Sequence, residues 1–298
     1  MITLLQLDYF RRLAASEHIT ATARELYISQ TALSNMLSGL EKELGVRLFD
    51  RVGRSIRLNE AGRIYLEHVN RAFASLENGR AAVEELSQRK GRQISIAMAS
   101  TQVWLPLLRA FHTACPDLAL RQFTYSAREL SQALADMTVD FVLAGEAEIT
   151  GEDLEKTLIR EESVCLCVPA GHPLAGRESL YLREVQDEPF ISLTEDSPWR
   201  VFCDRMLEDA GVRLHTAVEC DYTLRGPLVE SGFGVALTSS AAREVDLLRP
   251  NRYIRVADPC ARRSIYLFRN PRRFLSSAAE SFRQFCLDFF RGQREPSA

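Results

Sequence analysis

The sequence predicts three parts in chain order: an N-terminal all-α winged helix-turn-helix head, a long linker helix and a two-lobed α/β body. Residues 20–41 read as two short helices joined by a tight segment. Residues 59–90 contain no proline and repeat apolar residues at helical spacing. After Gly91 the pattern alternates between strands and helices, which favours βαβ units and a mostly parallel sheet. We therefore expect the parts to span 1–58, 59–90 and 91–298.

The head begins with a capping-box pattern, Thr3-Leu4-Leu5-Gln6, which opens a first helix. The next two helices are expected to start at the N-caps Thr20 and Ser29. Apolar residues at helical spacing should close a three-helix core, and they are Leu7, Phe10, Leu13, Ala14, Ala23, Leu26, Ile28, Leu33 and Leu37.

The helix that follows Ser29 has two distinct faces. One is an apolar stripe of Leu33, Met36, Leu37, Leu40 and Leu44. The other carries short, uncharged residues that can donate or accept hydrogen bonds: Gln30, Thr31, Ser34, Asn35 and Ser38. That second face suits close approach to base edges in a major groove. The alternative is a solvated face that lacks charge, although such faces are usually rich in Lys and Glu.

Residues 45–62 predict a β-hairpin wing, because two β-prone runs flank the turn signal Val52-Gly53-Arg54. Four arginines and a single acid, Asp50, lie between Arg47 and Arg57. A basic hairpin beside a helix in the groove can rest on phosphates and fix its register. The expected DNA-binding residues are Ser29, Gln30, Thr31, Ser34 and Asn35 toward bases, and Arg51, Arg54 and Arg57 toward phosphates.

The linker helix repeats Leu66, Val69, Phe73, Leu76 and Val83 at spacings of three, four and seven, as in a coiled-coil seam. It could also pack on its own domain. We favour pairing with a second copy, because a helix of about 30 residues extends roughly 45 Å and would outrun a small head.

In the body we expect strands at Gln93–Ala99, Leu118–Phe123, Val139–Ala144, Val164–Pro169, Phe190–Leu193, Leu214–Cys220, Val235–Thr238, Tyr253–Val256 and Ser264–Phe268. The expected helices are Val103–Ala114, Ala127–Asp136, Pro198–Ala210, Thr223–Glu230 and Phe274–Phe290. Crossovers near Arg160–Ser163 and Arg263–Leu267 would divide the body into lobe I (about 91–160 and 268–298) and lobe II (about 161–267). Two lobes joined in this way resemble periplasmic solute-binding proteins.

Residues 1–90 resemble the amino-terminal region of LysR-type transcriptional regulators. The matching pattern is Leu7-x-x-Phe10, Thr20-x-x-Ala23-x-x-Leu26, Ser29-Gln30-x-Ala32-Leu33-Ser34, Leu40-Glu41-x-x-Leu44-Gly45-x-x-Leu48-Phe49-x-Arg51 and Leu58-x-x-Ala61-Gly62. Thr31 and Asn59 depart from it, where the family commonly has proline and threonine. Weaker matches continue through the body: Leu105-Pro106, Asp140-Phe141, Val168-Pro169, His172-Pro173-Leu174 and Gly232-Phe233-Gly234-Val235.

The resemblance implies a regulator that binds double-stranded DNA at an interrupted inverted repeat. Its linker helices would pair antiparallel into dimers, and two dimers would form a homotetramer. A small-molecule effector would bind between the lobes and shift the geometry of the DNA-binding pairs.

Candidate effector-binding residues follow strands, where helix N-termini gather in an open α/β sheet. Ser100 and Thr101 follow the first strand of the body and suit an anion, typically a carboxylate. A plain helix cap explains them equally well. Thr194, Ser197, Thr223 and Arg225 come from the second lobe. Arg225 is the candidate charged partner of an acidic effector, and its alternative is an ordinary surface arginine.

Cys165-x-Cys167 could chelate a metal, since i and i+2 of a strand share a face. We favour the interpretation that these cysteines are two small buried residues in a core strand. Peroxide-sensing members of the family use a cysteine pair in the stretch that corresponds to about 193–211, where this chain has only Cys203. We expect no metal and no cofactor.

The composition is that of a soluble globular protein, with 46% hydrophobic and 26% charged residues. Residues 1–90 hold 13 basic against 11 acidic residues within a chain of net charge −3, so DNA affinity would rest on a local patch. No targeting or membrane segment is visible, and the expected location is cytoplasmic. A Cys/His-dependent enzyme and a free-standing solute receptor remain as alternatives. The first lacks a G-x-S-x-G, P-loop or G-x-G-x-x-G motif. The second is disfavoured by the wing and by the absence of a signal sequence.

Overall fold

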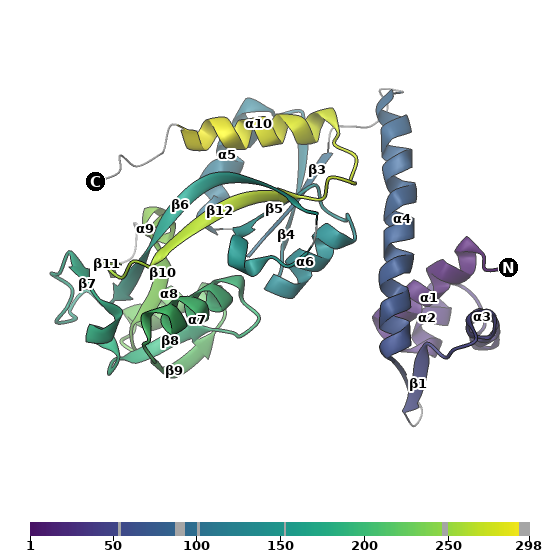
Figure 1. Cartoon of the computed structure of the whole chain (residues 1–298), viewed down its shortest axis with the longest axis horizontal. Coiled ribbons are helices and arrows are strands. Elements are labelled where there is room, and N and C mark those ends of the chain that lie inside the picture. Colours follow the sequence, from purple (N-terminus) through teal and green to yellow (C-terminus); the bar gives the residue numbers. More distant parts are fainter. Residues whose placement is uncertain (53–54, 87–92, 100–101, 152, 246–249, 292–298) are drawn as a thin grey trace. The chain divides into compact units, whose positions relative to one another are not determined.

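The computed structural model describes residues 1–52, 55–86, 93–99, 102–151, 153–245 and 250–291. The chain forms two compact units, Met1–Arg80 and Ala81–Ala298 (Figure 1). Among the described helices, none is both long and apolar enough to cross a lipid bilayer.

The first unit is built on three helices, α1 (Leu4–Ser16), α2 (Ile19–Glu25) and α3 (Gln30–Leu44). The predicted capping box is present: Thr3 Oγ1 accepts from the Gln6 N–H, and Gln6 Oε1 accepts from the Thr3 N–H. Fully buried side chains from all three helices close the core, as predicted, and they include Phe10, Leu13, Ala23, Leu33 and Leu40.

The predicted N-cap of α3 is confirmed, whereas that of α2 is wrong. Ser29 Oγ accepts from the Ala32 N–H at 3.1 Å. Helix α2 starts at Ile19 with His18 at the N-cap, so Thr20 lies inside the first turn. Its hydroxyl is instead turned toward α3, where it donates to Gln30 Oε1 at 3.1 Å. The prediction failed because the Thr20 side chain forms a contact between helices, which local sequence patterns do not reveal.

The wing is the antiparallel hairpin β1 (Phe49–Val52) and β2 (Ser55–Leu58). Helix α4 (Glu60–Leu86) follows, and Asn59 Oδ1 accepts from the Gly62 N–H at 2.9 Å at its start. Gly62 lies against the wing so closely that a Cβ there would stand 2.1 Å from the Leu48 carbonyl oxygen. Only glycine permits this approach of helix to hairpin.

The apolar stripe of α4 divides into two halves. Leu66, Val69 and Phe73 pack on the core of the head, which is the alternative that the sequence analysis set aside for this helix. Further along, Leu76 and Val83 are exposed by 52% and 66%. The expected seam for a second copy is therefore confined to the later part of the helix.

The second unit has two apolar cores, and the first of them consists of two clusters. It lies among β3 (Gln93–Met98), β4 (Ala119–Thr124), β5 (Phe141–Gly145), α5 (Leu105–Ala114), α6 (Ala127–Ala135) and α10 (Ser277–Arg291). The second lies among β7 (Ser179–Leu180), β8 (Pro189–Leu193), β9 (His215–Cys220), β10 (Ala236–Ser239), β11 (Arg252–Val256), α7 (Pro198–Ala210), α8 (Tyr222–Glu230) and α9 (Ser240–Val245). The second unit also contains the short helices η1 (Gln102–Trp104), η2 (Glu146–Glu148) and η3 (Leu182–Val185).

Two long strands connect these cores. β6 (Glu155–Val168) pairs with β12 (Arg262–Arg269) up to Ser163, and from Val164 onward it pairs with β10 and β11 (Figure 1). Only the second half of β6 was predicted. Both long strands run antiparallel to their neighbours, so the expected mostly parallel sheet is mixed. Ile265 and Leu267 pack in the first core, although the sequence analysis assigned residues up to 267 to lobe II.

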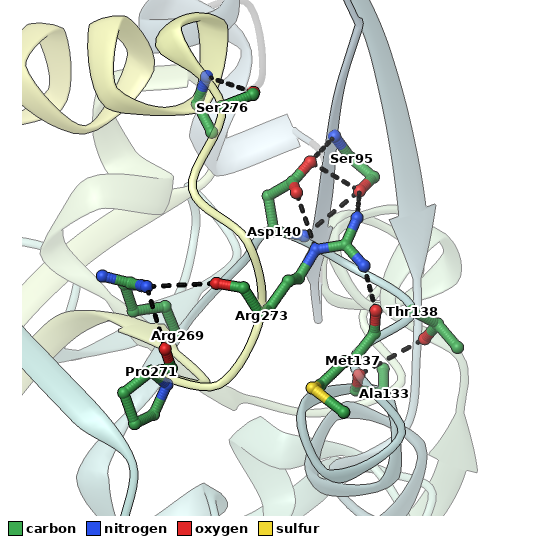
Figure 2. A network of polar contacts seen from close by, with 10 residues as sticks. Ser95, Ala133, Met137, Thr138, Asp140, Arg269, Pro271, Arg273 and Ser276 are labelled. Atoms are coloured by element: carbon green, nitrogen blue, oxygen red, sulfur yellow. Dashed lines mark hydrogen bonds and ion pairs between the residues drawn. The ribbon is translucent and has the colours of Figure 1, made fainter. Parts of the chain in front are cut away.

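A polar network fastens the segment before α10 to the first core (Figure 2). Arg273 Nε donates to Asp140 Oδ1 at 2.7 Å, and its Nη1 donates to the Met137 carbonyl oxygen. Asp140 Oδ2 accepts from both the backbone N–H and the hydroxyl of Ser95, each at 2.7 Å. One carboxylate, directly before β5, thus joins β3 to the segment between β12 and α10.

Candidate functional site

The polar face of α3 stands open to solvent. Ser29, Gln30, Thr31 and Asn35 are exposed, and Ser34 is half-buried. Leu33 and Leu40 on the opposite face are buried in the core of the head. The helix is therefore held by its apolar side, and a row of short uncharged side chains is left facing outward. Such a surface can approach base edges without desolvating a fixed charge.

The Gln30 side chain is held by a hydrogen bond from α2. Its Oε1 already accepts from the Thr20 hydroxyl, so its two amide N–H donors are left for an external acceptor. Position 30 is also the first residue of α3, where the helix N-terminus favours negatively charged groups such as phosphate.

The wing arginines differ in their surroundings. Arg51 and Arg57 are both exposed. Arg57 stands directly across the hairpin from Asp50, whereas Arg51 stands across from Ile56. Opposite charges at paired positions offset one another, so the positive charge of Arg51 is the less compensated. Arg54, the third predicted phosphate contact, lies outside the described residues.

Three of the predicted effector residues gather at one edge of the second lobe. β8 and β9 are parallel neighbours, so the segments that follow them emerge together. The Thr194 N–H donates to the Cys220 carbonyl oxygen at 3.2 Å, which ties the two segments. Ser197 is the N-cap of α7 without a side-chain capping bond, and the backbone N–H and hydroxyl of exposed Thr223 donate to Asp221. Ser100 and Thr101 lie outside the described residues.

The first lobe touches this edge through the start of α6, a helix that was expected from the sequence but not predicted to belong to the site. The Ala127 N–H of α6 donates to the Asp196 carbonyl oxygen at 3.1 Å. Ser126 caps α6 in a capping box with Glu129. The Ser-x-x-Glu spacing of this box is visible in the sequence and could have marked the site. The N-terminal regions of α6, α7 and α8 therefore face one neighbourhood between the lobes.

Arg225 is not an ordinary surface arginine, which was the alternative to a role in effector binding. It is also not exposed at the edge where Thr194, Ser197 and Thr223 lie. Its side chain is 7% exposed. Nη2 donates to Thr238 Oγ1 at 2.8 Å, and Nη1 donates to the Leu237 carbonyl oxygen at 3.3 Å. The guanidinium therefore points into lobe II, toward β10.

A buried ion pair marks the junction of the lobes. Arg263 on β12 has its Nε 3.2 Å from Glu148 Oε1, and its guanidinium lies over the rings of Trp199 and Phe202 on α7. Glu148 belongs to η2, which packs against α7. Burial raises the pKa of Glu148, and the opposing effects of Arg263 and the Gly145 N–H are smaller. Arg263 thus connects a carboxylate of one lobe with aromatic rings of the other.

The cysteines are mostly buried. Cys165 and Cys167 lie in the core half of β6, as predicted. Burial raises the pKa of the Cys203 thiol to about 12, so this thiol stays protonated near neutral pH. A protonated thiol is a poor nucleophile and a slow peroxide sensor. In the described part of the chain, no three His, Cys, Asp or Glu side chains are grouped to hold a metal ion.

These features define a class: a protein with a winged helix-turn-helix head and an α/β body whose two lobes meet beside helix N-termini. The family model "Bacterial regulatory helix-turn-helix protein, lysR family" matches residues 4–63, and "LysR substrate binding domain" matches residues 87–291. An HTH-type transcriptional regulator of Bacillus subtilis, YybE, is 31% identical over 96% of this chain and 98% of its own length. The chain belongs to the LysR family of transcriptional regulators.

Solved structures agree on the fold. CbnR, a LysR family transcriptional regulator, matches with a TM-score of 0.69 at 19% identity, over 97% of this chain and 99% of its own. Full-length CbnR complexed with its target DNA matches with a TM-score of 0.66 at 20% identity, over 98% and 99%. The two family models identify this protein as a DNA-binding transcriptional regulator with a domain that binds a small-molecule effector.

Proposed function

We propose that this regulator reads an interrupted inverted-repeat operator through α3 and the wing. Ser29, Gln30, Thr31, Ser34 and Asn35 face base edges in the major groove. Arg51, Arg54 and Arg57 hold phosphates, and the least compensated of the described two, Arg51, contributes most. The observation that carries the proposal is the uncharged, mostly exposed face of α3, opposite an apolar face whose Leu33 and Leu40 are fully buried.

Two copies pair through the later part of α4, where Leu76 and Val83 are exposed. A two-fold dimer presents two α3 helices to half-sites about one or more helical turns apart. Two such dimers form a homotetramer. The part boundaries proposed for this architecture are 1–58 for the head, 59–90 for the linker helix and 91–298 for the body.

The effector is a small carboxylate-bearing molecule that binds between the lobes. Thr194, Ser197 and Thr223 are the proposed effector contacts from lobe II, and Ser100 and Thr101, which follow β3 in the sequence, are further proposed contacts. An effector that contacts both lobes binds one arrangement of them better than another. The preferred arrangement changes the spacing of the paired heads and so the affinity for the operator.

The test compares the full-length protein on two DNA duplexes: one selected from a random library by the unsubstituted protein, and one of scrambled sequence. Gln30→Ala or Asn35→Ala should reduce the affinity difference between them by about 1–3 kcal/mol, the free energy of one good base contact. Lys42→Ala, an exposed change in the last turn of α3, is the control and should preserve discrimination. Full discrimination by both α3 variants would overturn the groove-facing assignment.

We assign no catalytic role to the chain and locate it in the cytoplasm, where an operator is accessible. The related proteins are named as transcriptional regulators. The one cysteine in α7 is held protonated by burial, which disfavours a thiolate nucleophile. A screen for turnover of esters, amides and thioesters should therefore give no rate above the buffer.

A further inference from the structure

A cavity of about 480 Å³ lies inside the second lobe, walled by α7, β8, β9 and the chain between α7 and β9. All its lining residues fall between positions 190 and 237, so the first lobe contributes none. It is therefore a different space from a cleft between the lobes. Its volume is in the range of small-molecule sites in proteins.

The floor of the cavity is apolar except for one cation. Buried Phe190, Leu193, Trp199 and Cys203 line it, and Arg225 joins them. The two described hydrogen bonds of Arg225 go to the Leu237 carbonyl oxygen and the Thr238 hydroxyl, both uncharged. Since a guanidinium has five N–H donors, others remain for an anion.

The charge of Arg225 is stabilised by uncharged groups alone in the part of the chain that the structure describes. No Asp or Glu of those residues forms an ion pair with this guanidinium, which contacts the Leu237 carbonyl oxygen, the Thr238 hydroxyl and the Tyr222 ring, the ring at 4.6 Å. A buried cation without a counter-ion is costly. An incoming anion would remove that cost, which makes Arg225 a recognition group rather than a mere packing element.

The remaining charges around the cavity limit the kind of anion. Arg200 is already engaged, because its Nε donates to both carboxylate oxygens of Asp204 at 2.7 and 2.9 Å. Exposed Glu208 and Arg213 stand at the outer part with opposite signs. One net positive charge therefore remains at the floor, and acidic side chains lie nearer the solvent. This pattern favours a single negative charge over two.

We propose that this cavity is a second small-molecule site, which takes a compact monocarboxylate with an aromatic or branched apolar body. The carboxylate binds Arg225, and the body packs against Phe190, Trp199 and Leu207. The site does not depend on the effector cleft between the lobes, and it gives the regulator a second chemical input within lobe II alone.

Trp199 lines the cavity and serves as the reporter of binding. The chain has two tryptophans, so a Trp104→Phe background leaves Trp199 as the only one. In the full-length protein we expect 3-phenylpropionate to change Trp199 fluorescence saturably. The uncharged 3-phenylpropionamide, nearly identical in shape, should bind at least tenfold more weakly, and so should the dicarboxylate phenylsuccinate.

Arg225→Met keeps most of the side-chain volume without the charge and should weaken 3-phenylpropionate at least tenfold. Thr216→Tyr, at an exposed lining position, should block entry and abolish the signal. Arg183→Met, which removes an arginine outside the cavity, is the matched control and should bind the probe as the background does.

Three results would overturn the proposal: no saturable change with 3-phenylpropionate, equal binding of the acid and the amide, or undiminished binding by Thr216→Tyr. If circular dichroism finds Arg225→Met unfolded, the acid–amide comparison and Thr216→Tyr still decide. Operator discrimination by the Gln30 and Asn35 variants is measured without any probe, so failure here is distinct from failure of the proposed DNA contacts.

Discussion

The head and the body place their polar groups in opposite ways. Helix α3 displays short, uncharged side chains to solvent, whereas the body buries full charges, with Glu148 and Arg263 at the junction of the lobes and Arg225 beside the cavity. An exposed hydroxyl or amide costs folding almost nothing. A buried charge is costly without a partner, and removing the partner of a buried ion pair is strongly destabilising. Changes to the exposed polar side chains of the head should therefore alter DNA binding at constant stability. Changes to the buried charges of the body should instead lower the stability.

The largest expected effect is that of Arg263→Met. It leaves the buried Glu148 carboxylate without its cation and should lower the free energy of unfolding by about 3–5 kcal/mol. Urea denaturation of the full-length protein measures it. The matched control is Arg272→Met, because Arg272 pairs with Asp153 where both side chains are more than 70% exposed. That change should cost less than about 1 kcal/mol. Equal losses in the two variants would contradict the contrast between buried and exposed charge.

The second largest effect is expected for Gly62→Ala. This change should lower the free energy of unfolding by about 1–3 kcal/mol, because it overpacks a tight contact. The added methyl group would meet the Leu48 carbonyl oxygen and Leu58 Cδ1. Gly79→Ala in the same helix is the control, since nothing lies within 4 Å of a Cβ there. It should stabilise α4 by about 0.5–1 kcal/mol. Thermal denaturation followed at 222 nm compares them. If Gly62→Ala left the stability unchanged, the wing would be able to move away from α4.

Arg51→Ala should change DNA binding without changing stability. Loss of one phosphate contact lowers the slope of log affinity against log salt by about one unit, equally on operator and scrambled DNA. Arg57→Ala should lower it less, because Asp50 stands across the hairpin from Arg57. Fluorescence anisotropy at several salt concentrations gives both slopes. An unchanged slope for Arg51→Ala would remove this residue from the phosphate contacts.

The smallest expected effect is a pH dependence of stability that depends on Glu148. Burial raises the pKa of its carboxyl in the folded protein above the ordinary value of 4.5. Between these two values the folded state holds a proton that the unfolded state has lost, so stability falls as the pH rises through this window. Glu148→Gln should remove that component, which urea denaturation from pH 4.5 to 7 can measure. An identical pH profile in the variant would mean that the carboxyl titrates normally.

Much of the head could be predicted from sequence because its determinants are local. The capping box at Thr3, the cap at Ser29 and the apolar stripe of α3 are spacing patterns within one helix. The error at Thr20 arose where a side chain bonded across to Gln30 instead of capping its own helix. Likewise, Val69 and Phe73 repeat as a coiled-coil seam would, yet their partner is the head's own core.

The body was predictable in its helices but not in its long strands or buried charges. Glu155–Ser163 lacks the alternation of polar and apolar residues that marks a strand, because its two large apolar residues, Leu158 and Ile159, are adjacent. The segment is held as a strand by pairing with β12, which follows much later in the chain. Arg225 sits among ordinary helix residues, so its burial depends on how α8 docks on β10. The Glu148–Arg263 pair joins positions that no local pattern relates.

Because β6 pairs with β12 as far as Ser163 and with β10 and β11 from Val164 onward, the lobes share a continuous strand rather than loose tethers. A ladder of hydrogen bonds resists stretching but yields to twisting, so relative motion of the lobes should be a rotation about these strands. A molecule that stiffens either end of the shared strand would then be felt at the far end, with no mobile loop needed to relay the signal.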